Sequence, residues 1–462
     1  MKKLCLLLIL SFFSAQGFSG ECPDGSEPVK SVSADGSYYE YKCGKGFGDE
    51  RIKNTTINER IKSITLGAML LDRNLFDLLD VNLDRIKANN FNSITLVVDW
   101  YVENHRDPKI LPRYPGQPFP TTDWFKPTLT HDEIEDIATR AKSRGLDVIL
   151  KMHVDALDWP FGGKGRYAIK PSAVLWKHYI DFATDTARIA EKINAEMLFI
   201  GTETHNLTKT NPANWVPVIQ AVQQIYSGPI SYAASFNGKA NFSASEWATP
   251  KSCGACAVKI WDQVDYIGFE PYAGLTLNKD PTLEEMKAGV RKIIDKVIIP
   301  LSEKHNKRII LPELNFYSFD GVNSNPISLD TSRYRVEQMP PDHEEQSMAY
   351  QAWLEVLNEA DYQEKFVGVI LWGGYLREES EKLKSWVHND NGDLIWGKKA
   401  EVTICEAFKA WTDVEKQTLT TEEAQDIICG MVAISEEQTA AEIAAQEMMD
   451  EILEEMAAES GQ

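Results

Sequence analysis

The sequence predicts an α/β fold, a (β/α)8 barrel, with a small N-terminal cap and an acidic C-terminal helical tail. Three observations predict it. Eight short runs of β-branched and apolar residues alternate with eight segments of helical hydrophobic spacing. The runs are almost continuously apolar, as in a parallel sheet covered on both faces. A doubly wound open sheet is the alternative, but no glycine-rich phosphate loop follows the first run.

The first half of the predicted barrel is regular. Its strands are apolar and β-branched, as in SITLGAM and SITLVVDWY. In its helices apolar side chains recur every three or four residues, and the second helix stops at Gly145, as helices often do. The predicted order is strand 63–69, helix 75–90, strand 93–101, helix 131–145, strand 147–155, helix 172–194, strand 195–203 and helix 212–226.

The second half repeats the alternation with longer loops. The run GPISYAASF precedes a loop with two cysteines, and VDYIGFEPY precedes a long helical segment. We expect the insertions 102–130 and 317–341 to form the walls of any cleft. The predicted order continues with strand 228–236, a short helix near 257–263, strand 264–272, helix 282–306, strand 307–316, helix 342–360, strand 367–375 and helix 402–416.

The N-terminal residues 1–17 have the pattern of a secretory signal peptide. Two lysines precede an apolar run, and small residues at Ala15 and Gly17 suit a cleavage site. The run is too short to span a bilayer, so we expect a secreted or periplasmic protein with no membrane span. Residues 18–60, rich in Gly, Ser, Tyr and Lys, would form the cap, with short strands around SYYEYKC.

The formal charge of −21 (48 Lys and Arg against 69 Asp and Glu) argues against a nucleic-acid partner. The excess is concentrated in the last segment of the chain, because residues 421–462 hold 12 Asp and Glu and no Lys or Arg. Apolar residues recur there at helical spacing. We therefore expect a barrel over 61–417 and an acidic helical tail over 418–462, either solvated or packed on the barrel or a partner; no oligomeric state follows.

Seven cysteines are present, and Cys5 would leave with the signal peptide. An even number of cysteines in an exported chain favours disulfides, although six permit 15 connectivities. The motif CGAC could instead be a redox or metal pair, but it lacks a second pair at zinc spacing. Our hypothesis pairs nearest neighbours: Cys22 with Cys43, Cys253 with Cys256, and Cys405 with Cys429.

Polar and aromatic residues gather at the predicted strand ends, where barrels of this class hold their active sites. Two of them, Glu203 and Glu313, end strands four and seven. Carboxylates cleave glycosidic bonds and flat rings cover the apolar faces of sugars, whereas a phosphate substrate would need basic groups, which this rim almost lacks. The candidate substrate-binding residues are Asp99, Trp100, His153, Asn206, Asn237, Glu270, Tyr272 and Trp372. No metal or cofactor is predicted.

Four motifs carry a family resemblance: FIGTE, DYIGFEPY, LPE and LWGGY, on predicted strands four, six, seven and eight. They resemble glycoside hydrolase family 113, whose known members are β-mannanases, within the retaining (β/α)8 hydrolases of clan A. The resemblance covers residues 63–400. It implies that Glu203 is the acid/base and Glu313 the nucleophile, about 5 to 5.5 Å apart. Many clan members have asparagine directly before the acid/base, where this chain has Thr202.

Other roles are open at this stage. Tyr272 could hydrogen-bond Glu313, and Trp372 could form the floor of the subsite where the bond breaks. Glu270 could bind a sugar hydroxyl, pair with another side chain or be the nucleophile itself. Asp99 and His153 could contact substrate or belong to a buried hydrogen-bond network.

The predicted function is a secreted retaining glycosidase that cleaves a β-linked polysaccharide or oligosaccharide, with β-1,4-mannan among the candidates. One alternative is a carbohydrate-binding barrel that has lost turnover. The other is an exported scaffold whose acidic tail binds a partner. The presence of both glutamates favours the enzyme, and the aromatic residues at the strand ends argue against the scaffold.

Overall fold

The computed structural model describes the barrel and one small sheet. The predicted signal peptide (1–17), the Cys22 and Cys43 pair and, apart from Cys429, the predicted tail (418–462) lie outside the described residues. The described residues are 29–32, 39–42, 57, 59–66, 78–118, 127–159, 163–210, 212–236, 253–324, 340–373, 392–416 and 429.

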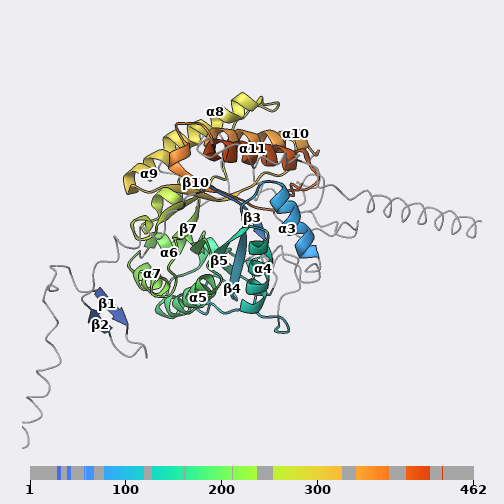
Figure 1. Ribbon diagram of the computed structural model, residues 1–462. Helices are drawn as coiled ribbons and strands as arrows, with labels where there is room; N and C mark the ends of the chain where they lie inside the picture. Colours follow the sequence, from blue (N-terminus) through green and yellow to red (C-terminus); the bar gives the residue numbers. More distant parts are fainter. Residues whose placement is uncertain are drawn as a thin grey trace, which may run out of the picture. The chain divides into compact units, whose positions relative to one another are not determined.

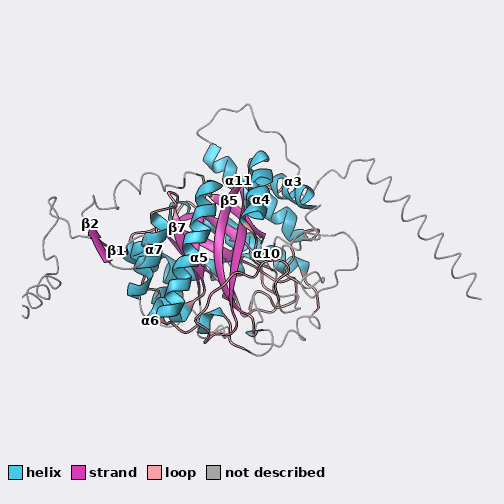
Figure 2. Cartoon of the chain, turned by 90° about the horizontal axis from the view of Figure 1, so that it is seen from below, coloured by secondary structure: helices cyan, strands magenta, loops and turns pink. Residues whose placement is uncertain are grey.

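Eight parallel strands close into a barrel that helices surround, which confirms the predicted (β/α)8 fold (Figures 1 and 2). The first and last strands complete the ring, because Gly368 of the last pairs with Ile61 of the first. Predicted strands four and seven are β6 and β9. In spatial order the strands are β10 (Phe366–Leu371), β3 (Ile61–Leu66), β4 (Ser93–Val102), β5 (Asp147–Ala156), β6 (Met197–Thr202), β7 (Ile230–Ser235), β8 (Tyr266–Glu270) and β9 (Ile309–Leu314).

The helices follow the predicted alternation with two differences. The expected short helix near 257–263 is two 3-10 turns, Ala255–Ala257 and Trp261–Gln263. The expected helix 282–306 is interrupted by a π-helical turn, Ile294–Ile298, just before Pro300, whose missing N–H cannot continue the regular ladder. The α-helices are α3 (Leu79–Ala88), α4 (His131–Ser143), α5 (Ala173–Lys192), α6 (His205–Thr210), α7 (Trp215–Gln223), α8 (Leu283–Ile293), α9 (Ile299–His305), α10 (His343–Leu357) and α11 (Lys399–Lys416).

Helix starts are encoded locally. Thr130 begins α4 with a capping box, in which its side chain accepts from the Glu133 N–H and the Glu133 side chain accepts from the Thr130 N–H. Thr282 and Glu285 form the same motif at α8. Such caps satisfy backbone donors that no helical carbonyl can reach.

Two buried layers follow from the alternation of side chains along the strands. One apolar cluster fills the barrel interior and includes Ile149, Phe199 and Ile310. A larger one lies between strands and helices, and Trp176, Trp353 and Trp411 are buried in it or beside it, as predicted for helical tryptophans. Along β4 and β5 every second residue therefore points into the barrel.

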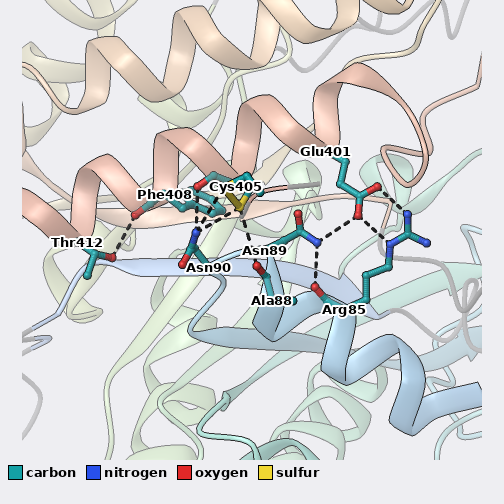
Figure 3. The surroundings of a disulfide bond; sticks show 9 residues. Arg85, Ala88, Asn89, Asn90, Glu401, Cys405, Phe408 and Thr412 are labelled. Atoms are coloured by element: carbon teal, nitrogen blue, oxygen red, sulfur yellow. Dashed lines mark hydrogen bonds and ion pairs between the residues drawn. A yellow bond between two sulfur atoms is a disulfide. The ribbon is translucent and has the colours of Figure 1, made fainter. Parts of the chain in front are cut away.

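The closing helix α11 is joined to α3 by side chains that Figure 3 shows. Arg85 donates from Nε to Oε1 of Glu401 at 2.7 Å and from Nη2 to Oε2 at 2.6 Å. Asn90 Nδ2 donates to the Cys405 carbonyl oxygen at 3.2 Å. Cys405 is disulfide-bonded to Cys429, and Cys253 to Cys256, so both of these predicted pairings are confirmed.

Residues 1–56 form a separate unit, in which β1 (Val29–Val32) pairs antiparallel with β2 (Tyr39–Lys42). This agrees with the short strands expected around SYYEYKC. Within the part of the chain that the structure describes, no helix combines the length and apolar character that crossing a membrane requires.

Candidate active site

Glu203 directly follows β6 and has an unusual backbone. Its φ of +51° is in the left-handed region, which costs a residue with a side chain on the order of 1–3 kcal/mol. Two hydrogen bonds hold it there: its N–H donates to the Ala233 carbonyl at 2.9 Å, and its carbonyl accepts from the His205 N–H at 2.8 Å. Thr202, before it, is fully buried at the end of β6. Such strain is typical of functional residues.

Glu313 lies in β9, and both of its carboxylate oxygens are held. The Tyr272 hydroxyl donates to Oε2 at 2.6 Å, which confirms the predicted hydrogen bond between these residues. Lys151 Nζ donates to Oε1, and His153 Nε2 lies 3.9 Å from that same oxygen. With 7% of its surface exposed, Glu313 is nearly sealed from water but not inaccessible.

Lys151 is a site residue that the sequence reading missed. It lies in β5, is fully buried, and also contacts Glu270 Oε1 and the Pro312 carbonyl oxygen, each at 3.3 Å. The expectation that basic groups are almost absent was wrong, because Arg166 is here too. The available signal was a lysine inside an apolar strand, two residues before His153 and therefore on the same face.

The electrostatics separate the carboxyls into different roles. Burial, and next the charge of Glu313, raises the pKa of Glu203, with Arg166 and Lys151 partly opposing the rise. Burial, followed by the charge of Glu313, also raises the pKa of Glu270 well above its ordinary value. Glu203 is thus suited to begin a reaction protonated.

Tyr272 is kept as a hydrogen-bond donor. Burial, and next the negative charge of Glu313, raises the pKa of its phenol well above the ordinary value. The hydroxyl therefore keeps its proton at neutral pH and continues to donate to Glu313.

Arg166 organises the second half of the cluster. It belongs to a short 3-10 helix, Arg166–Ala168, and donates to the two Asp155 oxygens at 2.9 and 3.1 Å and to His153 Nδ1 at 2.8 Å. Arginine only donates, so Nδ1 is the acceptor and the neutral ring carries its proton on Nε2. Burial, then the charges of Arg166 and Lys151, lowers the pKa of His153 well below its usual value. The protonated Nε2 faces Glu313.

Asp99, His153 and Asp155 bring ligand atoms within 4.8 Å of one another, which raises the question of a metal ion. Arg166 already binds Asp155 and His153, and so supplies the positive charge that the group needs. Burial, and next the charge of Asp155, raises the pKa of Asp99 well above its usual value. These three residues fit a protonated carboxyl beside an Arg–Asp pair better than a divalent ion.

The remaining candidates divide. Trp372 lies parallel to the His153 ring, with centroids 6.0 Å apart and an interplanar angle of 1°, and its own ring is 5.7 Å from Lys151 Nζ. Trp100 is not in the site: it points out of the barrel and stacks on Phe182 of α5 at 4.8 Å, because only alternate residues of β4 face inward. Asn206 is exposed on α6, and Asn237 lies outside the described residues.

His205, next to Asn206, has a buried structural contact instead. Its Nε2 hydrogen-bonds Ser235 Oγ at 2.8 Å, which links α6 to β7. Burial, and next the charge of Lys209, lowers the pKa of His205 to about 4. The ring is therefore neutral at physiological pH.

The closed barrel and the carboxyl cluster at its strand ends define a glycoside hydrolase of the (β/α)8 class. A family profile described as Glycoside Hydrolase Family 113 matches residues 83–385, which is 303 of the 462 residues. The chain belongs to this family, as its motifs suggested.

Solved structures with similar folds agree. A β-1,4-mannanase of the same family is 20% identical, with a TM-score of 0.56 over 76% of this chain and 99% of that chain. A family 113 β-mannanase from Alicyclobacillus acidocaldarius is 21% identical, with a TM-score of 0.57 over 76% and 98%. An endo-β-1,4-mannanase from Thermotoga petrophila is 11% identical, with a TM-score of 0.50 over 77% and 78%. These likenesses show the fold. A search of curated proteins found no match.

Proposed function

We propose that this protein is a retaining glycoside hydrolase that cleaves β-1,4-linked mannan or a related β-linked glycan, with Glu203 as acid/base and Glu313 as nucleophile. The observation that carries the proposal is the unequal environment of the two glutamates. Lys151 and Tyr272 both donate to Glu313, which favours its ionised form, while burial and the charge of Glu313 raise the pKa of Glu203.

In the first step Glu313 attacks the anomeric carbon. A bond forms between that carbon and a carboxylate oxygen as the glycosidic C–O bond breaks, and the Glu203 proton passes to the leaving oxygen. The product is a glycosyl ester on Glu313 with Glu203 ionised. Tyr272 keeps its proton throughout and continues to orient the Glu313 carboxyl.

In the second step water replaces the ester. Glu203, now a carboxylate, takes a proton from water as the water oxygen bonds to the anomeric carbon and the ester bond breaks. Glu313 returns to its ionised form beside Lys151. Two displacements leave the anomeric configuration unchanged.

Mannan is the first substrate to try, for two reasons. Family 113 structures with the same fold are named as β-1,4-mannanases or β-mannanases. The partly buried Trp372 beside His153 offers a flat apolar surface to a sugar ring at the site.

Export is also part of the proposal. The N-terminal pattern of a signal peptide supports it, and so do two disulfide bonds, which persist in oxidising compartments. A polymeric glycan is a substrate that an exported hydrolase would meet.

The test is hydrolysis of mannan, glucomannan, cellulose, xylan and galactan by the mature protein, with the anomeric configuration of the first products followed by NMR. We expect β-mannosidic cleavage with retention. Inversion would refute the two-step mechanism, and binding of glycans without turnover would identify a carbohydrate-binding barrel instead.

A further inference from the structure

Lys151 is placed where a buried charge must have a purpose or a full set of partners. Its side chain is fully buried, and an ammonium taken out of water is costly unless it is paired and hydrogen-bonded. Its three donors meet three acceptors: Glu313 Oε1, Glu270 Oε1 and the Pro312 carbonyl oxygen. One cation thus stands between two carboxyls of neighbouring strands.

The two carboxyls are not held equally. Glu313 also accepts from Tyr272 on its second oxygen. Glu270 Oε2 meets no donor among the described residues, as expected of an oxygen that itself carries a proton. Burial, then the charge of Glu313, raises the pKa of Glu270. One ammonium can neutralise one carboxylate, and these contacts direct it to Glu313.

We propose that Lys151 is a positioning residue of the hydrolase site, which keeps Glu313 ionised and fixes its Oε1 edge so that Glu313, rather than Glu270, acts as the nucleophile. This inference rests on the proposed function. The strand itself sets the placement, because Ile149, Lys151 and His153 share the inward face of β5. Trp372 lies 5.7 Å from Nζ, so the charge pair is shielded from water and little screened.

The experiment replaces Lys151 by methionine, by glutamine, which keeps an N–H donor without the charge, and by arginine, which keeps the charge. Activity on the glycan that the parent cleaves is measured as kcat/KM against pH, with folding checked by circular dichroism. The glutamine variant serves if the methionine variant does not fold.

We expect both neutral variants to lose about 100-fold in kcat/KM at the optimum. Their acid limb should move up by about 1 to 3 pH units, because Glu313 loses its cationic partner and is protonated more readily. Arginine should keep the acid limb near that of the parent.

The control is Lys62→Met. Lys62 is 2% exposed at the amino end of β3, where its Nζ donates to Thr412 Oγ1 at 2.7 Å, so it is also a buried lysine of a barrel strand but lies at the end opposite the site. We expect lower thermal stability and an unchanged pH profile. This separates the general cost of removing a buried lysine from the effect on Glu313.

Two outcomes bear on different claims. If folded Lys151→Met or Lys151→Gln keeps the parent acid limb while Glu313→Ala is inactive, Lys151 is structural and this inference is overturned, whereas the proposed function stands. If Glu313→Ala keeps the parent rate, the nucleophile assignment fails and this inference falls with it.

Discussion

At the scale of single residues, the unequal pair of glutamates is the feature on which function depends. Glu203 sits on a strained turn with a raised pKa, whereas Glu313 is held by an ammonium and a phenol. The same residue type therefore takes two roles because its surroundings differ.

Replacing each glutamate should separate these roles. Glu313→Ala removes the nucleophile, so we expect turnover to fall to background on every substrate. Glu203→Ala should lose about 100- to 10,000-fold on mannan, yet far less on an aryl glycoside whose leaving group needs no proton. Added azide, which attacks the glycosyl ester without a general base, should speed the Glu203→Ala variant and leave Glu313→Ala inactive. Equal losses on both substrates would contradict the assignment.

Two tryptophans near the strand ends provide a second residue-level prediction. Trp100→Ala opens a cavity against Phe182 and should cost about 3 to 5 kcal/mol of unfolding free energy. The folded fraction should keep the parent KM, since Trp100 does not face the site.

Trp372→Ala should show the opposite pattern. We expect a raised KM or lowered kcat with a smaller loss of stability, because Trp372 is partly buried beside His153. Denaturant unfolding and steady-state kinetics on both variants check the pair. A kinetic defect confined to Trp100→Ala would reverse our placement of the two side chains.

At the scale of elements, the contact between α3 and α11 closes the barrel. Arg85 and Glu401 form a bidentate ion pair, and the disulfide of Cys405 lies beside Asn90 (Figure 3). Asn90 lies between α3 and the start of β4, which is the amino end of the strands and opposite the site.

Removing this disulfide should therefore affect stability and leave catalysis unchanged. The double variant Cys405→Ser, Cys429→Ser opens a link across 24 residues and should lose roughly 2 to 4 kcal/mol. The matched control, Cys253→Ser with Cys256→Ser, opens a link of only three residues and should lose less. Thermal unfolding and kcat/KM measure both. A large fall in kcat/KM for the first variant would contradict the separation of the disulfide from the site.

At the scale of the whole molecule, stability should depend on pH through buried carboxyls. Burial, then the charges of Asp147 and Glu59, raises the pKa of Glu196 to about 8. Its ordinary value is 4.5. The stabilising contribution of its neutral form is thus complete below pH 4.5 and lost as pH rises through about 8.

Glu196→Gln should abolish that loss. We expect the variant to unfold at the same temperature as the parent near pH 4 and at a higher temperature at pH 9. The control Glu303→Gln changes an exposed glutamate of α9 and should show no such pH-dependent gain. Thermal unfolding across this pH range decides, and a gain that is equal at both pH values would exclude the ionisation of Glu196 as its cause.

The sequence by itself determined the barrel, the places of Glu203 and Glu313 at strands four and seven, two of the disulfides and the bond between Tyr272 and Glu313. These follow from local patterns, because hydrophobic period and strand order depend on near neighbours in the chain. The same patterns led us to put Trp100 at the site, since alternation tells which residues share a face but not which face is inward.

Only the tertiary structure decided which charges meet inside the barrel. Lys151 is 119 residues from Glu270 and 162 from Glu313 along the chain, and Arg166 reaches His153 from a loop helix without a repeating pattern. Their proximity exists only once the strands have closed on one another. The pKa shifts that separate the roles of the glutamates arise there too, because burial and neighbouring charge are properties of the folded chain.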